Sequence, residues 1–453
     1  MPSATSTTNT LILGGDANDS LDVSSIGSTA QYRNFNIFEK TGTSTWALTG
    51  TATAATPWTI EQGTRQIGNG GTSGSVIGNI ADDAALAFDR SDVFTFGNVV
   101  SDTGMVNQVG TGTTVLTAAN TYRGGTNVMA GTLAVGDAAD TNATIGTGLT
   151  SAAAGATLGG YGMALGSGNS SGTIAAANTL ASLASGNTGT FSLGGNLDNA
   201  GVVNLAAASG QIGNVLKVAG NYTGSNGQLV LNRLLNTGGA TSQSDQLAVG
   251  GNVSGNTVIK LNQSGTGAAT VGDGIELVQV TATSAANSFR LSGPVQAGAY
   301  EYLLYQGGAA DANDWYLRSE LEAPSSPASG AATATSPASG TTPARSSANS
   351  VTPAAATAYR PAAVGYSVTP LHIADYGFTV LGQLHERIGA VENAQPGQPV
   401  QNNGVWGVLE DRISMRTPAK GSLPTKARFS HSSEKTGRFR AALTVQARMR
   451  AQS

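Results

Sequence analysis

The chain of 453 residues has no cysteine, three histidines and few charged side chains, which make up 11% of it. Without cysteine there is no disulfide bond and no thiolate metal site, which suits a secreted bacterial protein stabilised by backbone pairing. A formal net charge of −4 gives no general case for nucleic-acid binding. No stretch reaches the roughly 18 apolar residues of a membrane-spanning helix. The composition therefore predicts neither a disulfide scaffold nor a helical membrane protein.

The residues that form helices best are also scarce. Glu, Lys and Leu are sparse, whereas glycine accounts for 62 residues and Asn, Thr, Ser and Ala fill much of the rest. This balance disfavours a mainly helical fold and favours many short β-strands with frequent turns.

The N-terminus lacks the features of a secretory signal peptide. The segment from Met1 to Ala30 has no basic start and no apolar run. Either the protein is cytosolic or its true N-terminus is missing, and the resemblance given below favours the second interpretation.

The sequence matches itself at an offset of 68, the difference between positions 47 and 115. Ala47-Leu48-Thr49 falls on Val115-Leu116-Thr117, and Gly63-Thr64 falls on Gly131-Thr132. Each unit consists of short alternating strands that cannot bury their apolar side alone, so stacked copies predict a solenoid. A coil of a parallel β-helix has a little over ~20 residues, so the offset corresponds to about three coils with matching residues stacked in register.

Stacking explains the bland composition of these units. Leu116, Val128, Leu133 and Val135 are predicted to stack inside, with Gly124-Gly125 forming a corner. A shorter echo begins with Gly-Asn and an apolar residue in 78–88, 195–205 and 220–232.

The pattern changes towards the C-terminus. The segments AYEYLLY (299–305) and DWYLRSEL (314–321) are rich in aromatics and predict a β-hairpin that closes the solenoid. Proline among Ala, Ser and Thr then predicts a disordered linker. In 366–392, apolar residues recur at three and four and predict an amphipathic helix that is too polar to face lipid: Leu371, Ala374, Phe378, Leu381, Leu384, Ile388 and Val391.

Four blocks resemble one family, and they occur in its order. Residues 112–136 look like the autotransporter-associated β-strand repeat, and 32–51 are similar to the stretch that precedes it. Residues 272–321 resemble the autochaperone end of a pertactin-like passenger, and 359–389 resemble the linker helix before the C-terminal β-barrel. The resemblance implies a type V secretion system of a Gram-negative bacterium, with an outer-membrane β-barrel and the barrel assembly machinery as partners.

The chain departs from the family after Trp406-Gly407. A membrane barrel needs at least ~8 strands of ~10 residues, and the basic tail shows no such alternation. We therefore expect a truncated or frame-shifted gene product. Ten of the 23 Lys and Arg residues lie after residue 400, and a contact with anionic lipid or nucleic acid is the alternative to accidental sequence there.

The predicted fold is all-β: a right-handed parallel β-helix capped by a β-hairpin region, followed by a disordered linker and one amphipathic helix. The predicted parts are a β-helix passenger (1–140), its continuation (141–271), an autochaperone-like cap (272–322), the linker (323–358), the linker helix (359–394) and a vestigial barrel start, also disordered (395–453).

The predicted function is that of a structural passenger, a surface-displayed or secreted adhesin or virulence-type protein, monomeric, with a possible host surface ligand. We expect no enzymatic activity, no catalytic or metal-binding residues and no cofactor. The alternatives are the remnant of a surface hydrolase whose catalytic domain lay upstream, and a calcium-binding β-roll-like module.

Several motifs have a functional and a structural interpretation. GGDANDSLD (14–22) nearly fits a calcium-binding nonapeptide, with Ala17 in place of glycine, but only one copy exists. GNSSG (168–172) places Ser170 in a nucleophile-elbow pattern, yet Gly- and Ser-rich flanks produce such matches by chance. The structural interpretation, a plain β-helix turn in each case, is the one we favour.

Two side-chain groups complete the candidates. The three histidines are His372, His385 and His431, and His385 with Glu386 and Arg387 lies in the predicted helix, where no second ligand suggests a metal. Tyr300, Tyr302, Tyr305, Trp315 and Tyr316 could form a carbohydrate platform, with Tyr300 and Tyr302 on one face. Burial in the cap is the interpretation we favour for these aromatics.

Overall fold

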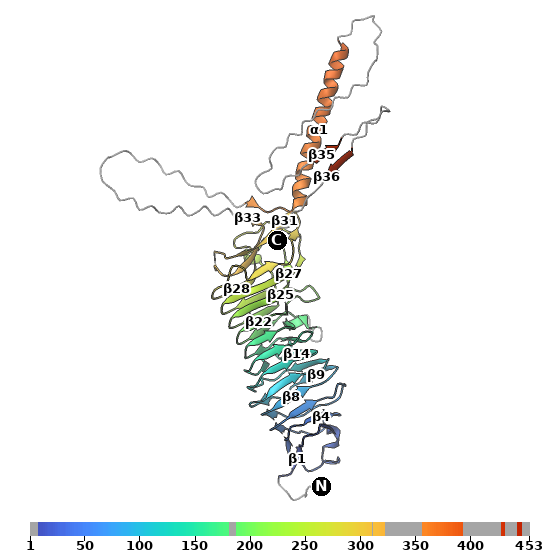
Figure 1. Ribbon diagram of the computed structural model, residues 1–453, viewed down its shortest axis with the longest axis vertical. Coiled ribbons are helices and arrows are strands. Elements are labelled where there is room, and N and C mark those ends of the chain that lie inside the picture. The colour runs from blue at the N-terminus through green and yellow to red at the C-terminus, as the bar shows by residue number, and fades with distance from the viewer. Residues whose placement is uncertain are drawn as a thin grey trace, which may run out of the picture. The chain divides into compact units, whose positions relative to one another are not determined.

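The computed structural model describes residues 8–180, 187–309, 311–321, 356–392, 427–430 and 442–445, with the backbone alone for 379–392 and the last two ranges. The chain divides into two compact units, Met1–Arg360 and Pro361–Ser453. Most of the first unit is a stack of short strands that runs from β1 (Thr10–Leu13) to β29 (Phe289–Leu291) (Figure 1).

The strands of this stack lie on three faces, and each strand pairs in parallel with the strand of the next coil. Face 1 contains β1, β3 (Ile37–Lys40), β5 (Trp58–Ile60), β7 (Ile80–Asp82) and β10 (Val100–Ser101), and resumes with β15 (Thr144–Ile145), β18 (Met163–Ala164), β21 (Thr190–Leu193), β24 (Val215–Val218), β26 (Gln246–Val249) and β28 (Ile275–Val280). Face 2 contains β2 (Asp19–Asp22), β4 (Thr45–Thr49), β6 (Thr64–Ile67), β8 (Ala85–Phe88), β11 (Met105–Gln108), β13 (Thr126–Val128), β16 (Thr150–Ala152), β19 (Gly168–Ser170) and β22 (Leu197–Asn199).

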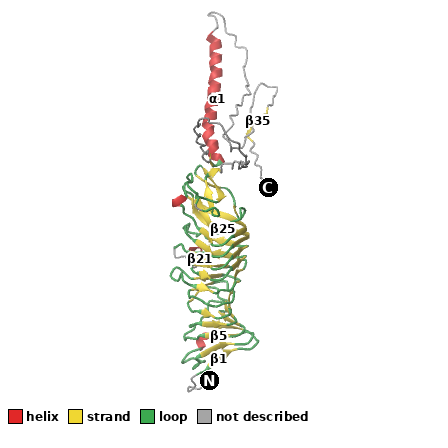
Figure 2. Cartoon of the chain, turned by 90° about the vertical axis from the view of Figure 1, so that its left-hand side faces the viewer, coloured by secondary structure: helices red, strands yellow, loops and turns green. Residues whose placement is uncertain are grey.

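Face 3 begins later in the chain than the other two. It contains β9 (Val93–Phe96), β12 (Thr113–Leu116), β14 (Thr132–Val135), β17 (Thr157–Gly160), β20 (Thr173–Ala175), β23 (Val202–Asn204) and β29. The long strands β25 (Tyr222–Leu234) and β27 (Val253–Ser264) run through faces 2 and 3. The strands stack one above another with loops at the corners (Figure 2). The predicted parallel β-helix is confirmed.

The interior is a continuous apolar column. Alternation turns every second side chain inward, and stacking places it ~4.8 Å from its counterpart in the next coil. Leu116, Val128, Leu133 and Val135, the predicted core positions, are each at most 1% exposed. Each such side chain contributes roughly 1.5–3 kcal/mol through burial, so the column as a whole dominates stability.

The predicted register of the sequence repeat is wrong. Thr45 pairs with Thr64 on face 2, whereas its counterpart Thr113 pairs with Thr132 on face 3. Matching residues therefore do not stack on one another. The first coils have strands on faces 1 and 2, and β9 adds the third face between the two copies, which moves the second copy forward by one face.

Each copy of the repeat instead forms the same corner in two successive coils, together with the strands on either side of that corner. We call this unit a pair of stacked corners. In the first copy Phe38 pairs with Trp58, a spacing of 20 (58 − 38), and Thr45 with Thr64, a spacing of 19 (64 − 45). In the second copy Val106 pairs with Thr126 (126 − 106 = 20), and Thr113 with Thr132 (132 − 113 = 19). The same spacings are thus used once between faces 1 and 2 and once between faces 2 and 3.

The Gly-Asn pairs of 195–205 and 220–232 mark the corner between faces 1 and 2, whereas that of 78–88 precedes β7 on face 1. The side-chain carbonyl of Asn196 accepts the backbone N–H of Asn221 at 2.8 Å, and that of Asn221 accepts the N–H of Asn252 at 2.8 Å. The side-chain carbonyl of Asn252 in turn accepts from the hydroxyl of Thr283 at 2.7 Å. Each coil therefore fixes the corner of the next through one amide side chain.

At two of the corners that follow face 1, a bulky side chain packs against a glycine of the next coil. A Cβ atom on Gly104 would lie 2.3 Å from the carboxyl carbon of Asp82, and one on Gly146 would lie 2.6 Å from the Tyr122 ring. In these two places a bulky side chain thus occupies the space that glycine leaves in the next coil. Tyr122 is fully buried, and its hydroxyl lies 2.6 Å from the Thr126 hydroxyl.

The second unit contains helix α1 (Pro361–Glu392) and two strands, β35 (Ala427–Ser430) and β36 (Ala442–Val445). The helix prediction is confirmed, and the helix begins before residue 366. Within the described part of the chain, no helix has both the length and the apolarity to cross a membrane. The predicted disorder of 395–453 does not hold for β35 and β36, which pair antiparallel with Phe429 opposite Leu443. The rest of the predicted vestigial segment lies outside the described residues.

Asp82 makes the stability of the β-helix depend on pH. Burial raises the pKa of this carboxyl from 3.8 to about 7, with a smaller contribution from the charges of Asp83 and Asp102. The folded chain therefore holds a proton that the unfolded chain releases near pH 4. We expect the contribution of Asp82 to stability to be greatest below pH 4, to fall by up to about 4 kcal/mol as the pH rises to 7, and to change little above that.

The free energy of unfolding, measured by urea titration between pH 4 and 8, checks this dependence. Asp82→Asn should reduce the fall in stability with pH, because the amide keeps a hydrogen-bonding group without a titrating proton. Part of the slope should remain, because burial also raises the pKa of Asp245 to about 6. Glu61→Gln, at an exposed carboxylate, is the matched control and should keep the slope. A slope in Asp82→Asn as steep as that of the natural chain contradicts the prediction.

Candidate functional site

The C-terminal end of the β-helix is closed by antiparallel strands. β31 (Tyr300–Gln306) pairs antiparallel with β32 (Trp315–Arg318), and β30 (Val295–Ala297) pairs with β31 on its other side. β32 also pairs antiparallel with β28, the last strand of face 1. The predicted hairpin is confirmed, and it covers the edge that the last coil would otherwise expose.

An aromatic column ties this cap to the preceding coils. The rings of Tyr222 and Phe289 are stacked with centroids 6.0 Å apart, and the rings of Phe289 and Trp315 meet edge to face at 5.3 Å. The indole N–H of Trp315 donates to the Ser284 hydroxyl at 2.9 Å. Aromatic pairs of this kind contribute roughly 0.5–1.5 kcal/mol beyond burial.

The predicted aromatic group is a core element and not an open platform. Tyr302, Trp315 and Tyr316 are 0%, 3% and 5% exposed. The Tyr302 hydroxyl both accepts from the N–H of Ala268 and donates to its carbonyl, each at 2.8 Å. The Tyr305 hydroxyl donates to the Glu320 carbonyl at 2.9 Å. These side chains bind the cap together, which supports burial in the cap over a carbohydrate platform for Tyr302, Trp315 and Tyr316.

Carboxylates join β28 to β32 beside these aromatics. The side-chain amide of Gln246 donates to Glu276 at 2.7 Å, and Asp314 accepts from the N–H of Val280 at 2.6 Å. The Tyr316 hydroxyl donates to Asp314 at 3.1 Å. Burial, and then the charge of Asp314, raise the pKa of Glu276. This cluster fixes the position of the cap, and its hydrogen bonds are all internal.

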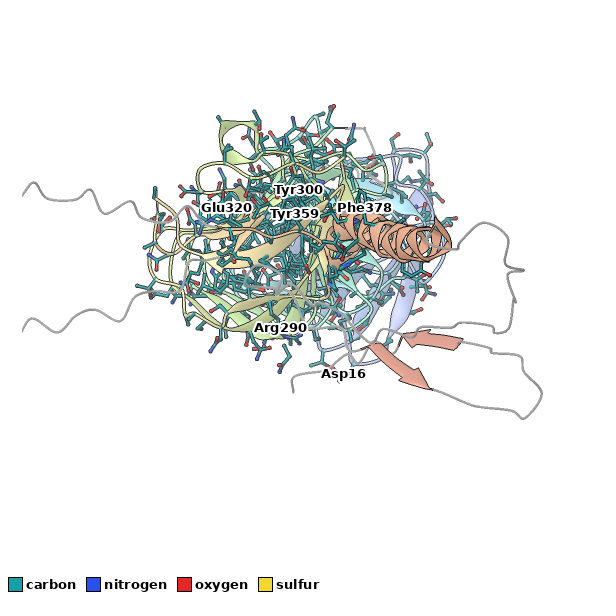
Figure 3. All side chains as sticks on the ribbon, turned by 90° about the horizontal axis from the view of Figure 1, so that it is seen from above. Asp16, Arg290, Tyr300, Glu320, Tyr359 and Phe378 are labelled. Carbon is teal, nitrogen blue, oxygen red and sulfur yellow. The ribbon has the colours of Figure 1, made fainter. Side chains whose placement is uncertain are left out.

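The chain returns to the cap after the linker. β34 (Ala356–Thr357) pairs antiparallel with β33 (Glu320–Leu321), and the N–H of Glu301 donates to the Ala358 carbonyl at 3.0 Å. The rings of Tyr300 and Tyr359 are stacked with centroids 5.7 Å apart, side by side at the capped end (Figure 3). The predicted disordered linker over 323–358 is therefore wrong for its last residues. The Ala- and Thr-rich composition gave no sign that this short segment pairs with the edge of the cap. The rest of the linker lies outside the described residues.

The calcium-like motif is used to build the first coils. The side-chain carbonyl of Asn18 accepts the N–H of Thr45 at 2.7 Å, and Asp22 accepts the N–H of Ser24 at 2.9 Å. Asp16 accepts from the Thr43 hydroxyl at 3.0 Å. In the described ranges no group of three or more His, Cys, Asp or Glu side chains is placed to hold a metal ion.

The serine and histidine candidates are not brought together. Ser170 faces inward on β19 and is fully buried, so a substrate cannot reach its hydroxyl. His372 is exposed on α1. Of His385, Glu386 and Arg387 the structure describes only the backbone within α1, and His431 lies outside the described residues.

Sequence reasoning missed three fully buried cations: Lys40, Arg65 and Arg233. Lys40 and Arg65 lie on the inner side of the first coils, and Arg233 lies on β25. The signal was available, because Arg65 alternates with the inward residue Ile67 on one strand, which places it on the core face.

Comparison with known proteins agrees with these features. The Passenger-associated-transport-repeat model matches residues 38–64 and 106–135, and the two starting positions differ by the offset of the sequence repeat (106 − 38 = 68). The Autochaperone Domain Type 1 model matches residues 192–304. The repeat matches coincide with the two pairs of stacked corners, and the autochaperone match contains the last coils and most of the cap.

Relatives point in the same direction. The chain is 44% identical over 119 residues to the uncharacterized protein YdeU of Escherichia coli strain K12, which covers 26% of this chain and 25% of that protein. It is 37% identical over 220 residues to the adhesin BmaC autotransporter of Brucella suis, covering 43% and 6%. It is 41% identical over 113 residues to the autotransporter adhesin AIDA-I of Escherichia coli, covering 24% and 8%.

The chain is an autotransporter passenger. The predicted family is confirmed, and the matched part spans at most a quarter of the length of these relatives. The autochaperone match begins at residue 192, within β21, and ends within β31, whereas the predicted cap occupied 272–322. The autochaperone region of the passenger thus includes coils of the β-helix as well as the antiparallel strands that close it.

Trp315 should be the most sensitive single position of the cap. Trp315→Ala removes the end of the aromatic column and leaves a cavity, and we expect a loss of about 3–5 kcal/mol in the free energy of unfolding. Urea denaturation followed by circular dichroism measures it. Tyr366→Ala, at an aromatic that is 75% exposed on α1, is the matched control and should change stability little. Equal losses in the two variants contradict a core role for Trp315.

Proposed function

We propose that the passenger is a structural stalk with an adhesive role, displayed on the outer membrane or secreted by a Gram-negative bacterium, and that its capped end folds first. The observation that carries this proposal is the parallel pairing that runs from β1 to β29, closed at one end by antiparallel strands. Such an array has length and rigidity, and each folded coil offers a complete edge to the next.

An adhesive role is supported by the relatives. BmaC and AIDA-I carry the word adhesin in their names. The outer faces of the β-helix present short polar rows, such as Asn107, Asn127 and Ser151, whose side chains hydrogen-bond from coil to coil. A cognate outer-membrane translocator and the barrel assembly machinery are the proposed partners in secretion. The surface-hydrolase alternative stays a prediction.

The part of the chain that can bury its apolar side chains without an already folded neighbour should fold first. The cap joins three antiparallel strands to the aromatic column, so it buries apolar surface from both sides, whereas a middle coil needs a neighbour already in place. We therefore propose that the coils add one after another from the cap towards β1, with each new strand paired to the last.

Two phenylalanines test the order of folding. Phe289 and Phe38 are 4% and 3% exposed, and they lie near opposite ends of the β-helix. Phe289 packs against the rings of Tyr222 and Trp315, and Phe38 packs against the ring of Trp58. Phe289→Ala should slow folding, because its contacts form before the rate-limiting step. Phe38→Ala should mainly speed unfolding. Stopped-flow folding and unfolding rates of the full chain in urea measure both effects, and the reverse assignment overturns the order.

Adhesion itself is tested by display. Beads coated with the folded chain should bind cultured epithelial cells in greater number than beads coated with the same preparation after unfolding in urea. Counting bound beads by microscopy gives the result. Equal binding by folded and unfolded chain means that the β-helix surface is not the adhesive element, and this outcome rejects the adhesive role.

A further inference from the structure

Arg65 is a fully buried cation inside the first coils. It faces inward on β6, where its register neighbours are Trp46 in the preceding coil and Leu86 in the next. The carbon at the centre of its guanidinium group lies 3.5 Å from the centroid of the Trp58 ring. The ring satisfies one flat side of the guanidinium through a cation–π contact. The ring offers no hydrogen-bond acceptor to the N–H groups on the edge of the guanidinium.

The edge of the guanidinium finds no acceptor. None of the described residues hydrogen-bonds to Nε, Nη1 or Nη2 of Arg65. The indole N–H of Trp58 likewise has no hydrogen-bond acceptor among them. Lys40, the other fully buried cation of the first coils, is different. Its Nζ donates to the carbonyls of Thr41, Gly42 and Gln62 at 2.7, 2.9 and 3.1 Å. Lys40 is therefore fully hydrogen-bonded, whereas the guanidinium of Arg65 lacks hydrogen-bond acceptors.

The charge of this region is uncompensated as well. In the described part of the chain the ion pairs are Arg90 with Asp92 and Arg318 with Asp273, so no carboxylate pairs with Lys40 or Arg65. Burial lowers the pKa of Arg65, and burial and then the charge of Arg65 lower the pKa of Lys40, which places the two cations within electrostatic reach of each other. An arginine keeps its proton in proteins, so its charge must be balanced.

We propose that a halide ion, chloride under physiological conditions, binds the free edge of Arg65 inside the β-helix. A water molecule would accept hydrogen bonds from one or two N–H groups but would not compensate the two positive charges. A monovalent anion would both accept the hydrogen bonds and reduce the net positive charge. The close packing of Trp58, Lys40 and Arg65, each at most 1% exposed, favours a single-atom ion over an oxyanion. The ion would be a structural ligand that links the first coils of the passenger.

Thermal unfolding of the full chain at constant ionic strength tests the proposal. Chloride is raised from about 1 to about 100 mM while gluconate is lowered, and circular dichroism gives the midpoint. We expect the midpoint to rise by roughly 2–4 °C. Arg65→Met should abolish the rise, because its side chain fills the site without a charge. Arg123→Met, at an exposed arginine, is the matched control and should keep the rise.

Each result decides the question. A midpoint that rises in the natural chain and in Arg123→Met, but not in Arg65→Met, supports the site. An equal rise in all three, or no rise, overturns it. If Arg65→Met does not fold, the 35Cl nuclear magnetic resonance line of the natural chain decides: broadening that disappears on unfolding in urea and is reversed by bromide supports the site, and its absence overturns it.

Discussion

Parallel pairing between successive coils is the constraint on which the passenger depends. No coil has a core of its own, because its strands are two to five residues long over most of the stack and bury one side only against the coils above and below. The pairing fixes which residues lie over which, and the alternation of side chains then decides what is inside. Burial, corner hydrogen bonds and buried charges all follow from this register.

The cap matters for the same reason. A stack held by edge pairing is incomplete at its ends, where backbone N–H and C=O groups face outward. At the C-terminal end the antiparallel strands β31 and β32, the aromatic column through Phe289 and the returning strand β34 complete the pairing. The described features thus place the best-defined closure of the fold in and beside the region that the autochaperone model matches.

The parts that could be predicted from sequence are those set by local periodicity. Alternation placed Leu133 and Val135 in the core, the aromatic segments gave the hairpin, and a spacing of three and four gave the helix. Register between distant coils could not be predicted, because it depends on how many strands each coil contains. Thr113 therefore came to lie on another face than Thr45. The pairing of Ala356 with the cap was hidden by a composition typical of linkers, and Arg65 was missed because charge is rarely expected on an inward position.

The bulky residues and glycines that fit together at two corners after face 1 bear on which insertions the stalk can accept. Asp82 and Tyr122 occupy room that Gly104 and Gly146 leave in the next coil. A coil inserted at either place during evolution would have to bring its own glycine opposite the bulky side chain. These two junctions therefore restrict where the β-helix can gain length.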